Sequence, residues 1–530
     1  MKIKRSIIQL SLAWILCCCG SNDQTKMYDN EIHTKSTAVL NGKELSLKYC
    51  QSCHLYPDAS VLDKHTWQRS VLPLMGRRFG IYEKEVPRSK VLAGAIDRDL
   101  VLQYNIFPEL PIIDEESWQK IIDYYVSSAP ESTRTIKINN PVLAPLKIFE
   151  VIIPRYKTKT PLTTLVQIDG KTSQVYVGGS KGNAGSLTIL NKDFKIIQEI
   201  KLPAPPVDLS VSIDTLALTL VGPLILSPSN NPRGRLLHIF RGPGETKYTL
   251  FNSFLDNLKR PLQTIFEDID ADGLDDLLIA DFGYYTGAVN LYRHAEGKKG
   301  SFEKSVLKNV SGAIRMYVND INKDGHKDVA VLFAQGDEGI SFFINDGNGE
   351  FKERRVLRFN PAYGSVYFEL VDINEDGHLD ILYCNGDNGD YPPVLKDYHG
   401  IRIFQNDGNN DFKEVYFYQM DGAYKCSATD FDLDGDMDIV AISYFPDPEA
   451  TPRRDFVYLK NLGNYSFFAE SLQQNIPARW VTLDIADLDG NGYPDIVLGA
   501  AGTKISSSSQ DRNLSDTGPS LVFLKNVGTK

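Results

Sequence analysis

The stretch that decides the fold is DINKDGHKDVAVLFA, residues 320–334. Its first nine residues place Asp or Asn at positions 1, 3, 5 and 9 and glycine at position 6, and a short apolar run follows. Four more copies of this pattern, D-x-[DN]-x-[DN]-G-x-x-D, begin at Asp268, Asp372, Asp430 and Asp487, at a spacing of 52 to 58 residues. A fixed period of this length indicates a repeat architecture.

The residue types in these five acidic loops suit a hard cation. Oxygen ligands at alternate positions, with a glycine that permits a sharp turn, form a cage for Ca²⁺. An EF-hand is excluded, because loop position 12 requires Glu and holds Ile279, Val331, Tyr383, Ala441 and Leu498. One copy alone would also fit a metal-free turn, but five in register favour about five calcium sites. The expected ligands are Asp268, Asp270, Asp272, Asp276, Asp320, Asn322, Asp324, Asp328, Asp372, Asn374, Asp376, Asp380, Asp430, Asp432, Asp434, Asp438, Asp487, Asp489, Asn491 and Asp495.

The flanks of each acidic loop are apolar and rich in β-branched and aromatic residues, so each loop should join two strands. These repeats resemble the FG-GAP and VCBS family of calcium-binding β-propeller blades, over residues 148–530. A third strand recurs seven times, beginning near Ser186, Arg235, Ala288, Ile340, Ile401, Phe456 and Leu521. The resemblance therefore implies an all-β propeller of seven blades.

The last blade lacks its outer strand, because the chain ends at LKNVGTK. The segment KIFEVIIP, residues 147–154, has the character of an outer strand and precedes the first blade. We expect it to complete the last blade and close the ring, which removes exposed sheet edges. Blades one and two, about residues 160–260, hold too few carboxylates in their loops to bind calcium.

A second motif, CQSCH at residues 50–54, lies near the start of the chain. It matches c-type haem attachment, in which the thiols of Cys50 and Cys53 add across the two haem vinyl groups and His54 ligates the iron. A zinc site would need a second pair of ligands, which does not follow within reach. A redox dithiol would follow a strand, whereas the residues before Cys50 have helical spacing.

Residues 38–130 resemble a small all-α cytochrome c domain with one covalent haem c. Its closing helix is expected in DEESWQKIIDYYVSSAP, residues 114–130, which has an acidic start, an apolar face and a final proline. Met75, on the loop-side stretch LPLMG, is the candidate distal ligand of the iron; His65 is the alternative, and a site with neither stays open. His/Met ligation saturates the iron and favours one-electron transfer.

The first residues, MKIKRSIIQLSLAWILCCC, have a basic start and an apolar stretch, which is typical of a secretory signal. The three cysteines indicate a bacterial lipoprotein signal over residues 1–19, with Cys19 as the lipidated residue and Cys18 as the alternative. A plain signal with incidental cysteines is the other interpretation. We therefore expect a lipid-anchored protein of the bacterial cell envelope, on the periplasmic or cell-surface side, with a tether at 20–37 and a linker at 131–146.

Composition restricts the partners. The formal net charge of -11 argues against a nucleic-acid partner, which would favour a basic patch. Cys384 and Cys426 are either bridged or two buried thiols. His326 and His378 occupy loop position 7, so their side chains should point outward.

The sequence thus predicts an electron-transfer protein whose partner is an unknown redox protein or small-molecule reductant, with a propeller that docks a glycan or a protein. The alternatives are a propeller dehydrogenase that passes substrate electrons to its own haem, and a surface lipoprotein that binds a glycan or a protein. A quinone cofactor is disfavoured, because the propeller contains only Trp480 where repeated tryptophan motifs would be needed. No catalytic residue is predicted.

Overall fold

The computed structural model describes residues 40–530, except 96, 134–143, 157–161, 224, 226–228, 231, 296–300, 390–393, 448, 451–452, 475, 477, 503–517 and 529–530. The expected signal segment, Cys19, the tether at 20–37 and most of the linker at 131–146 therefore lie outside the described residues. None of the described helices is long and apolar enough to cross a membrane.

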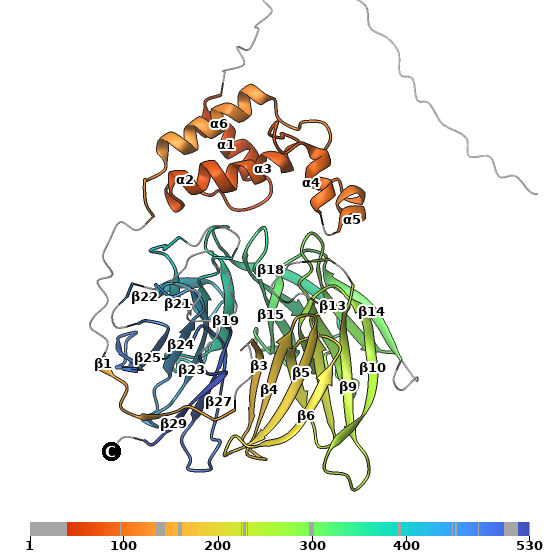
Figure 1. Cartoon of the computed structure of the whole chain (residues 1–530), viewed down its shortest axis with the longest axis vertical. Coiled ribbons are helices and arrows are strands. Elements are labelled where there is room, and N and C mark those ends of the chain that lie inside the picture. Colours follow the sequence, from red (N-terminus) through yellow and green to blue (C-terminus); the bar gives the residue numbers. More distant parts are fainter. Residues whose placement is uncertain are drawn as a thin grey trace, which may run out of the picture. The chain divides into compact units, whose positions relative to one another are not determined.

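A small helical region precedes the sheets (Figure 1). Its helices are α1 (Gly42–Cys50), α2 (Lys64–Thr66), α3 (Leu72–Arg78), α4 (Arg88–Gly94), α5 (Arg98–Gln103) and α6 (Glu115–Ser128). A capping box starts α1, since the Glu44 amide donates to Oδ1 of Asn41 at 3.0 Å and the Asn41 amide donates to Oε2 of Glu44 at 2.8 Å. At Gly42 a Cβ atom would lie 2.1 Å from the backbone oxygen of Lys120, so α1 packs against α6 at a distance that only glycine allows.

Seven sheets follow, each with at least four strands. Blades one to three contain β3 (Thr163–Asp169), β4 (Gln174–Lys181), β5 (Ala184–Asn191) and β6 (Ile196–Leu202); β7 (Pro206–Val211), β8 (Thr215–Leu220), β9 (Gly234–Arg241) and β10 (Tyr248–Leu258); and β11 (Pro261–Glu267), β12 (Asp276–Asp281), β13 (Ala288–His294) and β14 (Phe302–Lys308). Blades four and five contain β15 (Ala313–Asn319), β16 (Asp328–Phe333), β17 (Gly339–Asn345) and β18 (Phe351–Arg358); and β19 (Ser365–Val371), β20 (Asp380–Asn385), β21 (Gly400–Asn406) and β22 (Phe412–Gln419). Blades six and seven contain β23 (Ala423–Thr429), β24 (Asp438–Ser443), β25 (Phe456–Asn461) and β26 (Phe467–Ser471); and β27 (Trp480–Ala486), β28 (Asp495–Ala500) and β29 (Leu521–Asn526).

The ring closes as the sequence predicts. Strand β2 (Phe149–Ile152) pairs antiparallel with β29 and completes the last blade. A short strand that the sequence did not indicate, β1 (Ala144–Pro145), pairs parallel with β26 at the outer edge of blade six. The protein is therefore a seven-bladed β-propeller whose last blade is built from both ends of the propeller segment.

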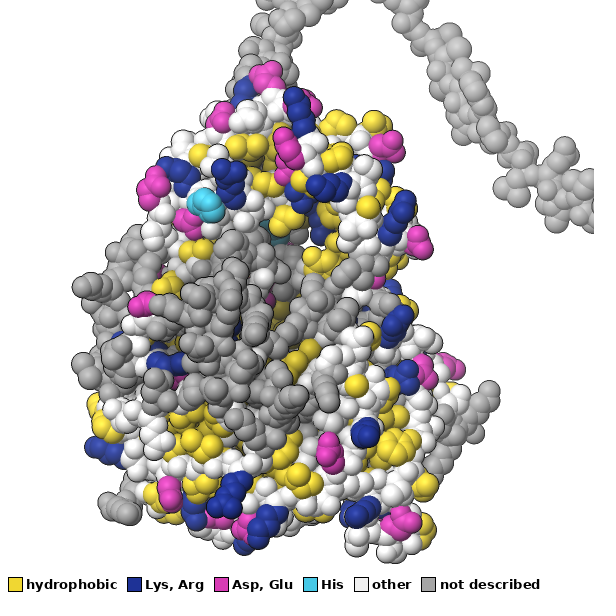
Figure 2. All heavy atoms as spheres, in the orientation of Figure 1, with side chains coloured by type: hydrophobic (Ala, Val, Ile, Leu, Met, Phe, Trp, Pro, Cys, Tyr) yellow, Lys and Arg dark blue, Asp and Glu magenta, His cyan; other side chains and the backbone are white. Residues whose placement is uncertain are grey.

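Apolar side chains between neighbouring blades form the core. Separate buried clusters lie at each of the seven blade-to-blade joints, for example Leu382, Ile401 and Val457 between blades five and six. Cys384 and Cys426 belong to that same cluster, and both are buried free thiols. The second strands β12, β16, β20, β24 and β28 are buried along their whole length, as their unbroken apolar runs predict. On the coloured part of the face seen in Figure 2, positive and negative side chains are interspersed.

The acidic loops and the CQSCH segment

Each acidic loop runs from the inner strand of its blade to the second strand, and its first aspartate organises the turn. In blade four the backbone N–H of Asp324 donates to Oδ1 of Asp320 at 3.0 Å, and that of Gly325 donates to Oδ2 at 2.9 Å. The same pair of bonds runs from residues 5 and 6 to residue 1 in the loops that begin at Asp268, Asp372, Asp430 and Asp487. The five loops therefore have one backbone conformation.

Two left-handed residues give the loop its shape. Glycine at position 6 has a positive φ in all five loops, as the pattern predicts. Position 4 is also left-handed, which the sequence did not indicate: its φ is 60° at Ala271, 62° at Lys323, 58° at Glu375 and 60° at Leu433. The fifth loop holds Gly490 there, with φ 81°. Four side chains are thus kept in a backbone conformation that costs energy, which indicates that the rest of the loop enforces it.

The ninth residue ties the loop to the third strand of its blade. In blade four, Oδ2 of Asp328 accepts the N–H of Ile321 at 3.0 Å, and Oδ1 accepts the N–H of Asn345 at 2.8 Å. Asp276, Asp380, Asp438 and Asp495 make the matching two bonds in their own blades. All five of these carboxyl groups are buried. The ninth aspartate therefore has a structural role that the ligand pattern alone did not predict.

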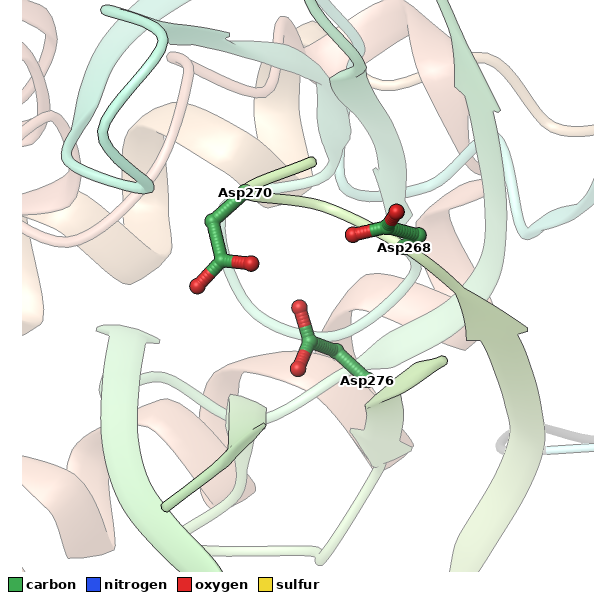
Figure 3. A group of neighbouring side chains, drawn as sticks. All are labelled: Asp268, Asp270 and Asp276. Atoms are coloured by element: carbon green, nitrogen blue, oxygen red, sulfur yellow. The ribbon is translucent and has the colours of Figure 1, made fainter. Parts of the chain in front are cut away.

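Carboxylates converge on one point in three of the loops. Oxygens of Asp268, Asp270 and Asp276 lie within 4.8 Å of one another, and Figure 3 shows these three side chains pointing toward a common centre. The other two groups are Asp430, Asp432 and Asp438, and Asp487, Asp489 and Asp495. The structure thus brings together the ligands predicted at positions 1, 3 and 9 in these three loops. The predicted position 5 ligands are not part of these groups; Oδ1 of Asp272, for example, accepts the N–H of Leu274 at 2.8 Å.

Two loops carry asparagine at position 3. Nδ2 of Asn322 donates to Oδ2 of Asp324 at 2.8 Å, and Asn374 bonds Asp376 in the same way at 2.8 Å. The His326 side chain is exposed, whereas His378 is half-buried with its Nδ1 at 3.3 Å from Nζ of Lys323. The prediction that both imidazoles point outward is therefore confirmed for His326, while His378 contacts a residue of the neighbouring loop.

The electrostatics of the loops favour a cation. Burial raises the pKa of the ninth carboxyl group in every loop, and the neighbouring carboxylates raise it further. The pKa reaches about 6 in Asp380, Asp438 and Asp495. Oδ1 of Asp270 and Oδ1 of Asp432 are buried and accept no hydrogen bond. A buried carboxylate oxygen without a partner is costly unless a cation meets it.

Two lysines reach into the acidic loops, and sequence reasoning missed them. Nζ of Lys460 contacts Oδ2 of Asp432, and Nζ of Lys525 lies 2.7 Å from Oδ2 of Asp489. Both lysines directly precede the asparagine that ends the third strand, in FVYLKN and LVFLKN. The lysine that recurs before this asparagine is the sequence feature that could have revealed the two contacts.

The CQSCH segment follows the end of α1. Cys50 is the last residue of that helix and is half-buried, and burial raises the pKa of its thiol to about 11. Cys53 is exposed, and both thiols are free. Nδ1 of His54 lies 2.9 Å from the backbone oxygen of Leu55. With its proton on Nδ1, the imidazole donates to this oxygen and keeps Nε2 as its free electron-pair donor.

Aromatic side chains support this segment. The Trp67 and Tyr125 rings lie 4.3 Å apart between centroids, and Nε1 of Trp67 donates to the oxygen of Ala59 at 2.9 Å. The Tyr125 hydroxyl donates to the oxygen of Pro57 at 2.8 Å. The Tyr125 bond ties Pro57 to α6, and the Trp67 bond ties Ala59 to a ring that packs on Tyr125. The segment that follows CQSCH is therefore held against the buried face of α6.

The two candidate distal ligands lie in helices. Met75 was expected on a loop, but it is inside α3 and half-buried, since α3 directly continues the helical turns of α2 and of the π-helix Trp67–Val71. The next residue, Gly76, packs against the Trp118 indole, where a Cβ atom would lie 3.1 Å from Nε1. His65 is exposed on α2. The loop placement of Met75 was therefore wrong, while its role as a ligand stays a prediction.

A comparison with protein-family models supports the propeller architecture. The family model described as "FG-GAP-like repeat" matches residues 268–331 and 320–383, which span the acidic loops of blades three to five. No curated protein matches the sequence. Among solved structures, Saccharomyces cerevisiae Sqt1 is 11% identical with a TM-score of 0.41, covering 71% of this chain and 98% of that one. The periplasmic gluconolactonase of Pseudomonas aeruginosa is 13% identical with a TM-score of 0.37, covering 58% and 84%. The chain is thus a seven-bladed β-propeller that contains FG-GAP-like repeats and carries a small helical region ahead of its first blade.

Proposed function

We propose that the protein is a c-type cytochrome of the bacterial cell envelope that transfers one electron at a time. Cys50 and Cys53 would hold haem c through two thioether bonds, and His54 would ligate its iron. The observation that carries the proposal is the contact between Nδ1 of His54 and the Leu55 oxygen in a CxxCH segment. A backbone acceptor on one imidazole nitrogen is the usual support of a metal-bound histidine.

The residues of the helical region fit this group. The two thiols are free, and Nε2 of His54 retains the lone pair that a metal needs. When bound, the haem supplies an iron that accepts and releases one electron. The chain's own residues then fix the imidazole through Leu55 and brace the CQSCH segment through Trp67 and Tyr125. Met75 is the proposed distal ligand, with His65 as the alternative.

Calcium is proposed at the five acidic loops. The donor set is made only of oxygen atoms, as Ca²⁺ prefers, and unpartnered oxygens of Asp270 and Asp432 lie buried among the other carboxylates. Burial raises the pKa of the ninth aspartates and the neighbouring carboxylates raise it further; a bound ion would relieve this repulsion between carboxylates. It would also stabilise the folded propeller by mass action, because unfolding separates the ligands. We therefore assign calcium a structural role.

The N-terminal sequence supports an envelope location. The proposed lipidation at Cys19 would anchor the chain to a membrane, and covalent haem attachment requires maturation machinery on the exported side. The redox partner would be a protein or a small-molecule reductant, and the propeller would dock that partner or a glycan. Dehydrogenase activity of the propeller is the competing function; reduction of the haem by a sugar or alcohol alone would favour it.

A potentiometric titration of the purified full-length protein tests the electron-transfer proposal. We expect a visible spectrum that changes reversibly with potential along a one-electron curve. His54→Ala should abolish or strongly shift this curve, whereas His65→Ala should leave it unchanged if Met75 is the distal ligand. A wild-type protein produced with haem maturation factors that shows no redox-active absorbance would refute the function.

A further inference from the structure

The five acidic loops are not equivalent, because a lysine of the third strand pairs with a loop carboxylate in only two of them, among the described residues. Nζ of Lys460, on β25, contacts Oδ2 of Asp432 and lies 3.3 Å from Oδ2 of Asp434. Nζ of Lys525, on β29, lies 2.7 Å from Oδ2 of Asp489. Both lysines hold the same place in their blades, one residue before the asparagine that ends the third strand. Each ammonium group therefore pairs with the position 3 carboxylate of its own loop.

The other three blades have no lysine at this place. Arg293 stands there in blade three, Ile344 in blade four and Gln405 in blade five. The Arg293 side chain turns to the next blade, where Nη1 donates to the oxygen of Asn348 at 3.2 Å. Three loops begin at Asp268, Asp320 and Asp372. Among the described residues, no Lys or Arg forms an ion pair with a carboxylate of these loops. Lys323 reaches the loop of blade five, but its Nζ donates to the backbone oxygen of Gly377 at 2.8 Å and not to a carboxylate. In the described part of the chain, the carboxylates of these three loops therefore have no paired counter-ion.

An ammonium group and Ca²⁺ are attracted to the same carboxylate groups. The Asp432 side chain is only 2% exposed; one of its oxygens contacts Lys460 and the other has no partner. Calcium takes six to eight oxygen ligands and could use only the unpartnered oxygen of Asp432 while Lys460 stays in place, and the ammonium group would then be a like charge beside the ion. The lysine side chains are 32% and 35% exposed, so each can move into solvent when a divalent ion enters. The calcium ion must then displace the ion pair between the lysine and the position 3 carboxylate, and it stays near the positive charge of the displaced ammonium group.

We propose that Lys460 and Lys525 are tethered counter-ions that compete with calcium in blades six and seven. The propeller then has two classes of cation site: three loops that take calcium first, in blades three to five, and two that take it only at higher concentration. Blade seven is the weaker of these two sites, because its loop has Asn491 at position 5 and therefore one carboxylate fewer than that of blade six. This inference rests on the proposed binding of calcium to the acidic loops.

The test counts bound calcium on the full-length protein by equilibrium dialysis, over free calcium from micromolar to millimolar. We expect about three ions to bind before the last two, which should have dissociation constants at least about tenfold higher, since displacing an ion pair and approaching a like charge both cost binding energy. In the double variant Lys460→Met and Lys525→Met, the two weak sites should tighten about tenfold and merge with the others. Lys201→Met, which removes an exposed lysine from blade one, is the matched control and should change nothing.

The possible outcomes separate this inference from the calcium proposal. Five sites of equal affinity in the wild type, unchanged by the double variant, would overturn the inference while calcium binding stands. No bound calcium in either protein would overturn both. Circular dichroism without calcium checks that the variants are folded, and Lys460→Arg, which keeps the charge, should retain the weak class of site.

Discussion

Oδ2 of Asp484, in the last blade, accepts a hydrogen bond from the backbone N–H of Ile168, in the first blade, at 2.6 Å. Asp208 bonds the N–H of Thr264 across the joint between blades two and three, and Glu369 bonds that of Ala428 between blades five and six. Inner-strand carboxylates thus join neighbouring blades around the centre of the ring. At the seam between the first and last blades, this bond adds to the closure that β2 provides at the outer edge.

Replacing Asp484 should therefore loosen the seam. In Asp484→Ala the N–H of Ile168 loses its acceptor in a deeply placed site, and we expect a loss of about 1–3 kcal/mol in unfolding free energy. Asp484→Asn keeps an acceptor and should lose less. Chemical denaturation followed by tryptophan fluorescence measures the difference, and equal losses in the two variants would show that the bond has no special role.

Substitutions of the ninth aspartate and of the third residue of a loop should respond differently to the removal of calcium. Asp328→Ala removes two bonds to backbone N–H groups and should lower the melting temperature both with calcium and with EGTA. Asn322 is exposed and bonds only within the loop, so Asn322→Ala should reduce the stabilisation by calcium and leave the melt in EGTA nearly unchanged. Thermal melts in both conditions check this. A calcium-independent effect of Asn322→Ala would contradict it.

A buried aspartate outside the acidic loops gives a pH prediction. Burial raises the pKa of Asp281 from 3.8 to about 6. A raised folded-state pKa means that protonated Asp281 favours folding below pH 4, and that this contribution is lost as the pH rises through 6. Asp281→Asn should therefore stabilise the protein at pH 7.5, by roughly 2–3 kcal/mol since one pKa unit corresponds to about 1.4 kcal/mol, and have little effect at pH 4. Urea unfolding at the two pH values measures this, and equal effects at both would refute it.

The distal ligand can be identified from the reduction potential. Methionine opposite histidine raises the potential of haem iron, so Met75→Ala should lower it and open a coordination position. His65→Ala is the matched control and should leave both the potential and the spectrum unchanged. If His65→Ala shifts the potential and Met75→Ala does not, the assignment is reversed. If neither variant shifts it, the iron has neither ligand.

Much of the propeller could be predicted from the sequence, because buried strands require apolar residues and so leave a regular pattern. The unbroken apolar runs after each acidic loop fixed the second strands, and the missing last strand explained the role of residues 147–154. Other features leave a weaker trace. Strand β1 has two residues, one of them a proline, so no periodicity marks it. The left-handed fourth loop residue is Ala, Lys, Glu or Leu in four blades, which are not residue types that indicate such a backbone.

The sequence indicated which residues belong to the candidate sites, but it indicated less well where those residues lie and what they contact. The first, third and ninth loop positions do meet in three blades, because a fixed turn brings alternate side chains to one side. Met75 was misplaced because LPLMG contains a glycine and a proline, which favour a loop. Here the proline lies in the first turn of α3, directly after the π-helix Trp67–Val71, and the glycine packs against Trp118. Lys460 and Lys525 lie 28 and 36 residues from the aspartates they contact, so only pairing of the strands reveals them.

The most direct test of the account is whether haem is bound covalently to Cys50 and Cys53. The full-length protein would be produced in an exporting host with cytochrome maturation factors, denatured, and analysed by mass and by visible absorbance. We predict that the denatured chain carries the mass of one haem, and that Cys50→Ala with Cys53→Ala carries none while the propeller still folds. A denatured wild-type chain with no bound porphyrin would contradict the central claim.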